Sequence, residues 1–536
     1  MIESPPVTPI HFGIKAEEDA GPDHAIGRLG TGRAAFVGRT LRGPVDRPVL
    51  ITSFTQFQHV FGGLWQPSQL GYAVEQYFDN GGREALIVRV ANGARCATLT
   101  LNAGAGSLKL GAVRPGTREF LRASVDYDNV QAAQEFNLTV QRVRVQGTAL
   151  VEDQEIFLKV SLDPTAPQFL PLALAESALI RLAGEIPAQR PDRTMDAVSG
   201  LATGYVNSNS DGDDGAPLTD YDLIGRQSDR TGLFALEHAD YFNFLCIPPL
   251  ARDQDVGPSA LLVGIRYCKE RRALMIIDPP SSWHTADDAL RGMRDWAFSS
   301  ENAVMYFPRV LAHDKLRGHF ESFAPSGAIA GMLARCDEAN PVWVPVRNDE
   351  AVLRPGYRPT CLVPEDRRIR LATLGVNTIQ AVRSAARIGV AARTLAAGAA
   401  ANADWQFLAS RRLALFIVNS IERGTRWLAG MPPSQTEAAE TAASQARSFL
   451  EALYAAQAFG PRNMADAFFV IADQRSEFQL VIGFAAHARP GFHTFRITHS
   501  AAGSKAAAIS LSRMNAAQLS PAELDWVESL AQSLAP

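Results

Sequence analysis

Asp278 is the side chain in this sequence that is best placed for acid–base chemistry. It ends the apolar run Ala273–Asp278, which reads as a strand between two helical stretches, and ligands of open α/β sheets bind at the carboxyl ends of such strands. A catalytic acid or base also needs a partner or a perturbing environment. The sequence places no histidine and no second carboxylate beside Asp278, and two prolines follow it directly. We therefore expect Asp278 to terminate a strand, with catalysis as the weaker alternative.

A glycine pattern near the start of the chain suggests a dinucleotide-binding loop. Gly30, Gly32 and Gly38 have the composition of such a loop. The glycines of a dinucleotide fingerprint follow a strand and open a helix. Here Gly30 and Gly32 precede the apolar strand Ala34–Gly38. The order is wrong for nucleotide binding, and we do not expect a nucleotide there.

Two further patterns suggest metal binding, and each lacks a required ligand. The loop Asn207–Gly215 is acidic and glycine-rich, but it has no glutamate at the twelfth position of a calcium loop, and its residues are ordinary turn formers. His487 and His493 flank a turn sequence, whereas a stable zinc site usually takes three or four ligands. The five cysteines are scattered without a C-x-x-C pair. We expect no metal, no cofactor and reduced thiols.

Length and charge restrict the class of protein. The chain has 536 residues, which is too long for one ordinary hydrophobic core and indicates roughly two to four domains. Its net charge of −4 gives no general attraction to nucleic acid. No apolar run is long enough to cross a bilayer, and the first residues lack the pattern of a signal peptide. We expect no nucleic-acid partner, no membrane insertion and synthesis in the cytoplasm.

The pattern of apolar residues changes several times along the chain. The first thirty residues have no helical or strand period and contain several prolines, so they predict an extended arm that needs a partner to become ordered. Strands and helices alternate from Ala34 to Val90 and again from 240 to 310, which predicts a parallel α/β sheet. Short alternating stretches between 95 and 220 predict a β-rich insertion. Two long helices and three strands follow, and the last strand, His493–His499, is expected to have a free edge.

The stretch from Ala34 to Asn92 closely resembles the N-terminal part of contractile phage tail sheath proteins. It contains the ordered pattern R-G-P-x-x-x-P-V-x-I-T-S-F, F-G-G, a helix leading to F-x-N-G-G, and a strand ending in R-V. The resemblance continues in four further blocks, Asp240–Pro249, Pro325–Arg335, Leu374–Ile379 and Arg411–Trp427, and it closes with AFFVIAD and FRI.

The resemblance implies a mixed α/β, multi-domain sheath fold. An α/β core would be built from both chain ends and the middle, and a β-rich domain would decorate the outer surface. The expected divisions are an arm (1–30), a first core part (31–94), the insertion (95–220), an α/β sheath domain (221–365), a C-terminal core part with the closing strand (366–500) and an extension with a short helix (501–536).

The resemblance also implies a non-enzymatic, structural function. Sheath subunits polymerise as a helical tube around an inner tail tube and contract to drive it through a target cell envelope. The implied partners are copies of this chain, the inner tube protein, and baseplate and terminator or cap proteins, in a virion tail or an extracellular particle assembled in the bacterial cytoplasm. Strand exchange between copies would use the arm and the closing strand, through Val7, Ile10, Phe12, Ile14, Thr494, Phe495, Arg496 and Ile497.

Two alternatives remain at the level of sequence. The chain could be a sheath-like cap or baseplate adaptor that has the same fold without polymerising. It could also be an α/β enzyme with Asp278 at the edge of its sheet.

Overall fold

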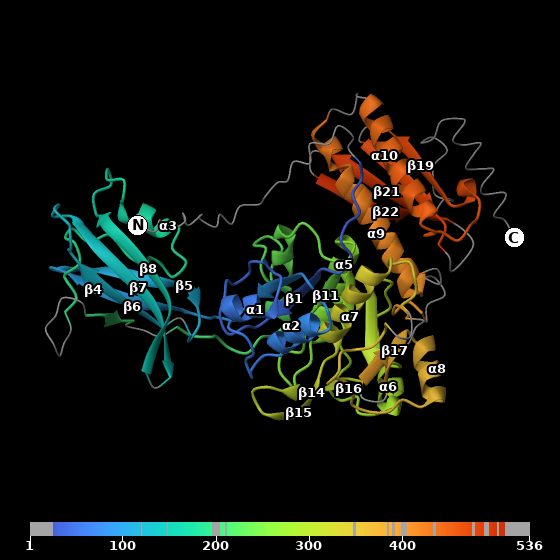
Figure 1. Cartoon of the computed structure of the whole chain (residues 1–536), viewed down its shortest axis with the longest axis horizontal. Coiled ribbons are helices and arrows are strands. Elements are labelled where there is room, and N and C mark those ends of the chain that lie inside the picture. The colour runs from blue at the N-terminus through green and yellow to red at the C-terminus, as the bar shows by residue number, and fades with distance from the viewer. Residues whose placement is uncertain are drawn as a thin grey trace, which may run out of the picture. The chain divides into compact units, whose positions relative to one another are not determined.

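The computed structural model describes two compact units, which are treated separately below (Figure 1). The core unit is Gly30–Phe416, and the terminal unit joins Met1–Leu29 to Ile417–Pro536. The described residues are 25–118, 120–146, 148–195, 204–208, 212–346, 350–382, 385–388, 392–397, 405–431, 436–473, 478–486, 492–500 and 503–509.

The core unit is built on an eight-stranded sheet. The strand order is β18-β17-β13-β12-β11-β1-β3-β2, and the six central strands from β17 to β3 pair in parallel. The strands are β1 (Ala34–Gly38), β2 (Val49–Ile51), β3 (Ala85–Arg89), β11 (Phe244–Cys246), β12 (Leu274–Ile277), β13 (Ala303–Phe307), β17 (Val376–Val382) and β18 (Ala385–Ile388). The predicted mixed α/β fold with a parallel sheet is confirmed.

Local sequence signals account for the first helix of this unit. α1 (Phe54–Phe61) begins after Ser53, whose side chain accepts a hydrogen bond from the backbone N–H of Gln56, as an N-cap does. It ends at Gly62, which has φ 89°, a left-handed conformation that glycine adopts without a steric penalty. Residues next to the helix therefore define both of its ends.

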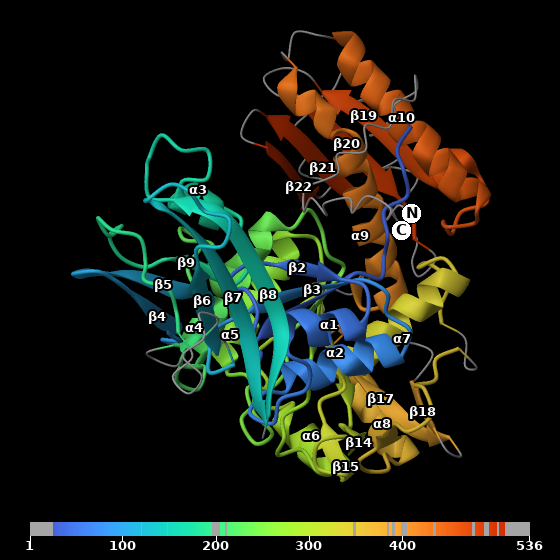
Figure 2. The same ribbon diagram turned by 60° about the vertical axis from the view of Figure 1, so that its left-hand side comes forward.

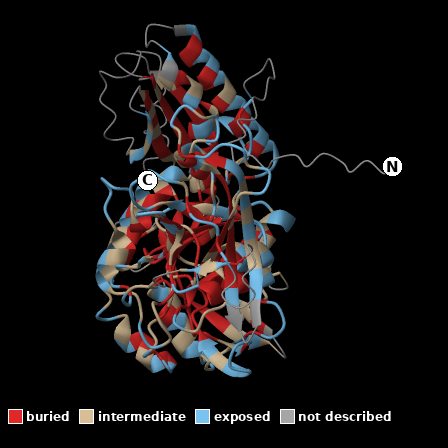
Figure 3. Cartoon of the chain, turned by 90° about the vertical axis from the view of Figure 1, so that its left-hand side faces the viewer, coloured by how far each residue is buried: buried red, intermediate tan, exposed pale blue. Residues whose placement is uncertain are grey.

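Helices cover both faces of the parallel sheet. Alternate strand residues face opposite ways, so Ala34 and Phe36 lie in one hydrophobic cluster and Ala35 and Val37 in another. The first face is covered by α1, α2 (Leu70–Asp79) and α7 (Ser326–Ala339). The second is covered by α4 (Asp220–Ile224), the 3₁₀ helix η1 (Gly232–His238), α5 (Pro258–Glu270), α6 (Ala286–Gly292) and α8 (Glu365–Thr373). Figure 3 shows these buried layers in red.

A small antiparallel sheet extends the first face. Its order is β15-β14-β16, and its strands are β14 (Val310–Asp314), β15 (His319–Phe323) and β16 (Arg358–Pro359). Val310 and Phe323 from this sheet belong to the same buried cluster as α2 and α7. None of these three strands was predicted from the sequence, because short strands with exposed polar residues have a weak periodic signal.

The insertion consists of two antiparallel sheets that enclose their own hydrophobic cluster (Figure 2). One sheet has the order β10-β6-β7-β8 and the other β4-β5-β9. The elements are β4 (Cys96–Ala103), β5 (Gly106–Pro115), β6 (Leu121–Asp126), β7 (Glu135–Gln146), β8 (Thr148–Ser161), α3 (Leu170–Ala175), β9 (Ile180–Leu182) and β10 (Val206–Asn207). Leu99, Leu110, Leu138 and Val140 are among its buried residues, as expected for sheets that face each other.

The terminal unit combines helices with an antiparallel sheet of order β19-β20-β21-β22. It contains the end of α9 (Leu408–Gly424), the 3₁₀ helices η3 (Arg426–Gly430) and η4 (Met464–Asp466), α10 (Thr436–Ala455), β19 (Phe468–Asp473), β20 (Phe478–Phe484), β21 (His493–Ser500) and β22 (Gly503–Ile509). Residues 366–500, expected to form one part, are divided: β17 and β18 join the parallel sheet, and β19 to β21 lie in the terminal unit.

Candidate functional site: the terminal sheet and the chain start

The closing strand β21 lies inside its sheet and is paired on both sides. Phe495 pairs with Ile482 of β20 on one side and with Ala508 of β22 on the other. The expectation that His493–His499 has a free edge is therefore wrong. The outer strands of this sheet are β19 and β22, and backbone pairing with another chain would have to occur at one of them.

The strand β22 was not predicted from the sequence, because its composition is unusual for a strand. Its sequence is GSKAAAI, and alanine and glycine are depleted in strands. It nevertheless continues the ladder from Ser500↔Gly503 to Thr494↔Ile509. Tertiary pairing with β21 thus overrides a weak intrinsic preference.

The side chains of β21 that were expected to contact a neighbour are mostly buried within this chain. Ile497 is 0% exposed, Thr494 4% and Phe495 6%. The Phe495 ring stacks on Phe484 with centroids 5.9 Å apart, and Phe484 lies 6.1 Å from Phe459. These residues stabilise the sheet from within, so any contribution of theirs to an interface between copies is indirect.

A buried histidine ties the last two strands to the end of α9. The Nε2 atom of His499 lies 2.8 Å from the Thr425 hydroxyl, and its Nδ1 atom lies 2.7 Å from the Ser504 hydroxyl. Burial lowers the pKa of His499 to about 4, although the nearby Glu422 carboxylate opposes this shift. His499 is therefore neutral at physiological pH. It was not identified as a site residue from the sequence, where nothing marks its contact with Thr425.

The first described residues, 25–29, lie in the same unit as the terminal sheet. The backbone N–H of Leu29 donates to the Ser420 hydroxyl of α9 over 3.3 Å. Ile26 is buried against Gly424, where an added Cβ would come within 2.8 Å of the Ile26 side chain. Figure 1 shows this N-terminal segment in dark blue beside α9. Residues 25–29 and the terminal sheet therefore belong to one compact unit, and Leu29 contacts Ser420 across 391 positions of the sequence.

The predicted arm residues lie outside the part of the chain that the structure describes. Val7, Ile10, Phe12 and Ile14 all precede Ala25, the first described residue. Their assignment to contacts between copies remains a prediction.

Asp278 lies at the carboxyl end of β12, as predicted, but it is enclosed by the start of α7. Its two carboxylate oxygens accept hydrogen bonds from the Ser326 backbone N–H over 2.8 Å and from the Ser326 hydroxyl over 2.7 Å. Burial raises the pKa of Asp278 to about 6, and the hydrogen bonds from Ser326 moderate the rise. A carboxylate at a helix N-terminus satisfies backbone N–H groups that lack partners in the helix. Asp278 therefore joins β12 to α7.

Ion pairs occupy the rest of this sheet edge. Arg309, which follows β13, pairs with Asp255 and donates to the Pro279 carbonyl over 3.0 Å. Arg252, from the segment after β11, pairs with Asp314 and Glu321 of the small sheet. Ligands of open α/β sheets bind at this edge. Here the charged groups of Arg252, Arg309 and their carboxylate partners are engaged with one another.

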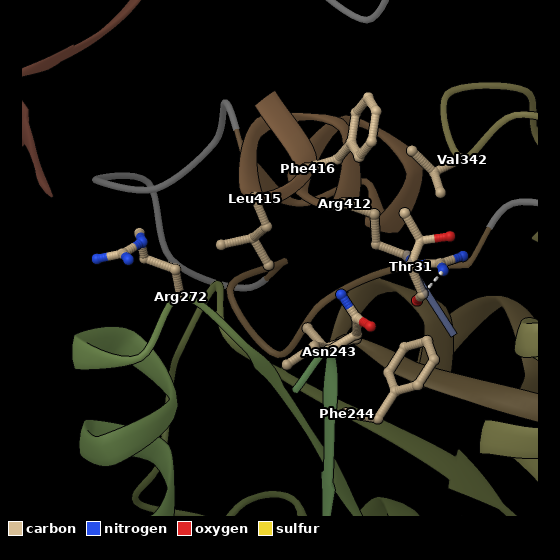
Figure 4. Close-up of a pocket in the computed structure, with 9 residues that line it drawn as sticks. Thr31, Asn243, Phe244, Arg272, Val342, Arg412, Leu415 and Phe416 are labelled. Carbon is tan, nitrogen blue, oxygen red and sulfur yellow. Dashed lines mark hydrogen bonds between the residues drawn. The ribbon is translucent and has the colours of Figure 1, made fainter. Parts of the chain in front are cut away.

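One described pocket lies near the opposite, amino ends of β11 and β12 (Figure 4). Its volume is about 20 Å³, which is room for about one water molecule. One of its two arginines, Arg412, pairs with the Asp337 carboxylate, which also accepts a hydrogen bond from the Thr31 hydroxyl over 2.8 Å. Asn243 accepts a hydrogen bond from the backbone N–H of Arg33 over 2.9 Å. The pocket is too small for a metabolite, and its polar groups hold structural contacts.

Gly30 and Gly32 precede β1. The glycines of a nucleotide-binding loop would follow a strand, so this order agrees with the argument made from the sequence. An added Cβ at Gly32 would come within 2.9 Å of Ala334 on α7. A close approach of helix and chain explains this glycine without any ligand.

The two metal-site patterns differ in how far the structure describes them. In the acidic loop, Asp213 accepts hydrogen bonds from the Gly215 N–H over 2.6 Å and from Arg95 over 3.0 Å, and Asp214 accepts one from the Thr117 hydroxyl over 2.7 Å. Of the histidine pair, His487 lies outside the described residues. Among the residues that are described, no group of three or more His, Cys, Asp or Glu side chains could hold a metal ion.

The five cysteines are unpaired. Cys246, Cys268 and Cys336 are buried, and Cys96 and Cys361 are partly buried. Burial raises the pKa of Cys336 to about 11, which disfavours the reactive thiolate. In the described part of the chain, none of the helices is long and apolar enough to cross a membrane.

Comparison with known proteins connects this architecture to one group of structures. The sequence matches no protein-family model, and no curated protein is similar to it. The comparison of three-dimensional structures does find similar proteins.

Several solved structures share the fold over most of its length. The sheath tail protein of Listeria innocua superimposes with a TM-score of 0.59, at 11% identity, over 89% of this chain and 96% of that one. The sheath tail protein of Desulfitobacterium hafniense gives 0.52, at 12% identity, over 91% and 100%. The contracted sheath complex of an extracellular contractile injection system, PVC, gives 0.51, at 15% identity, over 91% and 96%. This chain therefore has the fold of the sheath proteins of contractile tails and injection systems.

Proposed function

We propose that this chain is the structural subunit of a contractile sheath. In this role, copies polymerise as a helical tube around an inner tail tube and contract to drive it through a target cell envelope. The observation that carries the proposal is the extent of the sheath fold, which accounts for 89% of this chain and 96% of its Listeria counterpart. The ion-paired sheet edge at Asp278 and the single-water pocket favour a structural role over an enzymatic one.

Copies of the chain are linked through the terminal unit in this proposal. The arm, with Val7, Ile10, Phe12 and Ile14, adds a strand to the sheet of a neighbouring copy. The acceptor edge is β19 or β22, because β21 is paired on both sides. Thr494, Phe495, Arg496 and Ile497 belong to the strand that supports this sheet. Because the chain start and the sheet lie in one unit, links of this kind connect terminal units directly.

An assembly of this type needs no closed symmetry. An interface between different surfaces of two copies gives an open helical filament when its rotation does not close. The other proposed partners are the inner tube protein, the baseplate and a terminator or cap protein. The proposed location is a virion tail or an extracellular particle that is assembled in the bacterial cytoplasm.

Negative-stain electron microscopy of the purified full-length protein tests this proposal. We expect long striated tubes or contracted cylinders. Deleting residues 1–24 removes the arm and should abolish tubes, whereas deleting only residues 1–6 keeps Val7–Ile14 and should preserve them. Circular dichroism of both truncated proteins checks that the units remain folded.

Three results would count against parts of the proposal. Tubes formed without residues 1–24 would contradict linkage through the arm. Closed rings would favour a sheath-like cap or baseplate adaptor. An α/β enzyme would be favoured by two results together. The protein would stay monomeric at concentrations well above those used for electron microscopy, and a small molecule would bind saturably at the sheet edge that contains Asp278.

A further inference from the structure

The β-rich insertion is joined to the rest of the core unit by a narrow neck. In this neck Arg95 and Asp213 exchange backbone hydrogen bonds of 3.0 and 2.9 Å, and the Ala216 N–H donates to the Asn92 carbonyl over 2.9 Å. Gly93 has φ 68° and Gly215 has φ 76°, left-handed conformations suited to glycine. Two short paired segments form a ribbon that is only marginally stable by itself. The neck alone is therefore a poor device for fixing the orientation of a domain.

The loop that follows β1 holds the neck at its base. The Arg39 guanidinium donates to the backbone carbonyls of Asp214 over 3.0 Å and Gly215 over 2.8 Å. Its planar group lies over the Trp65 ring, 4.8 Å from the centroid, an arrangement that favours a cation. Arg39 therefore fixes the place where the insertion enters the core unit.

Three residues further on, the same loop holds the insertion at a second point. The Arg42 guanidinium donates to the Glu152 carboxylate of β8 over 2.8 Å and to the His59 carbonyl of α1, also over 2.8 Å. The side chains of Arg42 and Glu152 are only 9% and 13% exposed. A charge-assisted pair shielded in this way is stronger than a surface ion pair.

Arginines from the α/β core and from the insertion together hold Glu152 in its ionised form. Arg144 of β7 pairs with its Oε1 atom, and Arg142 of β7 lies 3.7 Å from its Oε2 atom. Burial by itself would raise the pKa of Glu152, but Arg144 and Arg42 outweigh this effect and hold the pKa below its ordinary value. Because Arg142 and Arg144 belong to the insertion, Glu152 keeps charged partners there when Arg42 is removed. The contact with Arg42 can therefore be broken without leaving a buried, unpaired carboxylate.

From this geometry we propose that Arg42 and Glu152 form a releasable latch between the insertion and the α/β core. When the latch is closed, the insertion is fixed at two points, the neck and β8. When it opens, the insertion pivots about the glycines of the neck while Arg39 keeps the base of the neck in place. Both halves stay folded, since each has its own hydrophobic cluster. The inference concerns the isolated chain and does not rest on the proposed function.

Distance measurements between two spin labels test the latch in the full chain. One label is placed at Asp128→Cys in the insertion and the other at Ser259→Cys at the start of α5, both exposed positions. The partly buried Cys96 and Cys361 are replaced by serine in this background. The wild-type latch should give one narrow distance distribution. Arg42→Met and Glu152→Gln should each broaden it and shift its maximum.

Glu155→Gln is the matched control. Glu155 lies on the same strand, but it accepts hydrogen bonds from Ser177 and Ala178 inside the insertion, so its variant should keep the narrow distribution. Hydrogen exchange of β4–β7 peptides reports whether the insertion remains folded in every variant. Distributions for Arg42→Met and Glu152→Gln that superimpose on the wild type would overturn the proposal. Equal broadening in Glu155→Gln would also overturn it, because the effect would not be specific to the contact with Arg42.

Discussion

Replacing Asp278 with asparagine should make the core unit more stable at neutral pH. The asparagine side chain has the same shape, and it can accept from the Ser326 N–H and donate to the Ser326 hydroxyl, so both contacts of the carboxylate are kept. What the substitution removes is a charge that burial disfavours.

The size of the effect follows from the pKa of Asp278. Burial raises this pKa from 3.8 to about 6, and each unit corresponds to about 1.4 kcal/mol. The folded state therefore keeps a proton that the unfolded state loses between pH 3.8 and 6. Since the folded state binds more protons in this window, stability falls as the pH rises through it. Ionisation of Asp278 therefore lowers the free energy of unfolding of the wild type by about 3 kcal/mol by pH 7, and the asparagine variant lacks this loss.

Thermal unfolding of the two proteins at a series of pH values measures the difference. The quantity of interest is the variant midpoint minus the wild-type midpoint, because contributions from other titrating groups cancel. With about 2.1 cal/mol/K of unfolding entropy per residue, about 3 kcal/mol corresponds to a shift of roughly 3 to 4 °C for a unit of this size. The difference should grow between pH 4 and pH 7 and then level off. A difference that stays constant over this range would refute the raised pKa and the structural role derived from it.

Three further substitutions test other parts of the structure. Gly331→Ala places a Cβ 2.2 Å from the Tyr77 carbonyl, where α7 crosses α2, and should destabilise the core unit by about 1–3 kcal/mol in thermal unfolding; a neutral result would mean that the helices are not in contact. Arg412→Met leaves the Asp337 carboxylate buried without its ion-pair partner and should lower the free energy of unfolding by about 3–5 kcal/mol. As a control, loss of the exposed pair between Arg266 and Glu270 should lower it by less than about 1 kcal/mol. Burial lowers the pKa of His499 from 6.5 to about 4, so the terminal unit should lose stability as the pH falls from 6.5 to 4. His499→Gln should remove this pH dependence of stability. The same pH profile in the variant and the wild type would contradict a neutral, buried histidine.

Ion pairs close one edge of the parallel sheet in the core unit. Ion pairs at the carboxyl ends of β11, β12 and β13 join loops that open α/β enzymes keep free for ligands. These internal ties hold neighbouring loops of the core unit together. The insertion, which is proposed above to pivot, has a hydrophobic cluster of its own and is not part of this sheet.

The sequence by itself determined the elements that depend on neighbouring residues. Ser53 and Gly62 delimit α1 through a side-chain cap and a left-handed turn, and both act within a few residues of each other. The run Ala34–Gly38 is apolar throughout, as a strand buried on both faces must be. The parallel α/β class followed from the alternation of such strands with helices.

Tertiary structure alone decided which edges and charges are free. The edge of β21 is closed by β22, an alanine-rich strand whose sequence gives a weak signal. In the sequence, Asp278 has no evident partner for its carboxylate. In the structure, Ser326 at the start of α7, 48 residues later, donates hydrogen bonds to it. The pairing of Arg42 with Glu152 joins positions 110 residues apart. Local sequence fixes helices and strands through short-range sterics and capping, but contacts between distant side chains depend on how these elements pack, which no local pattern encodes.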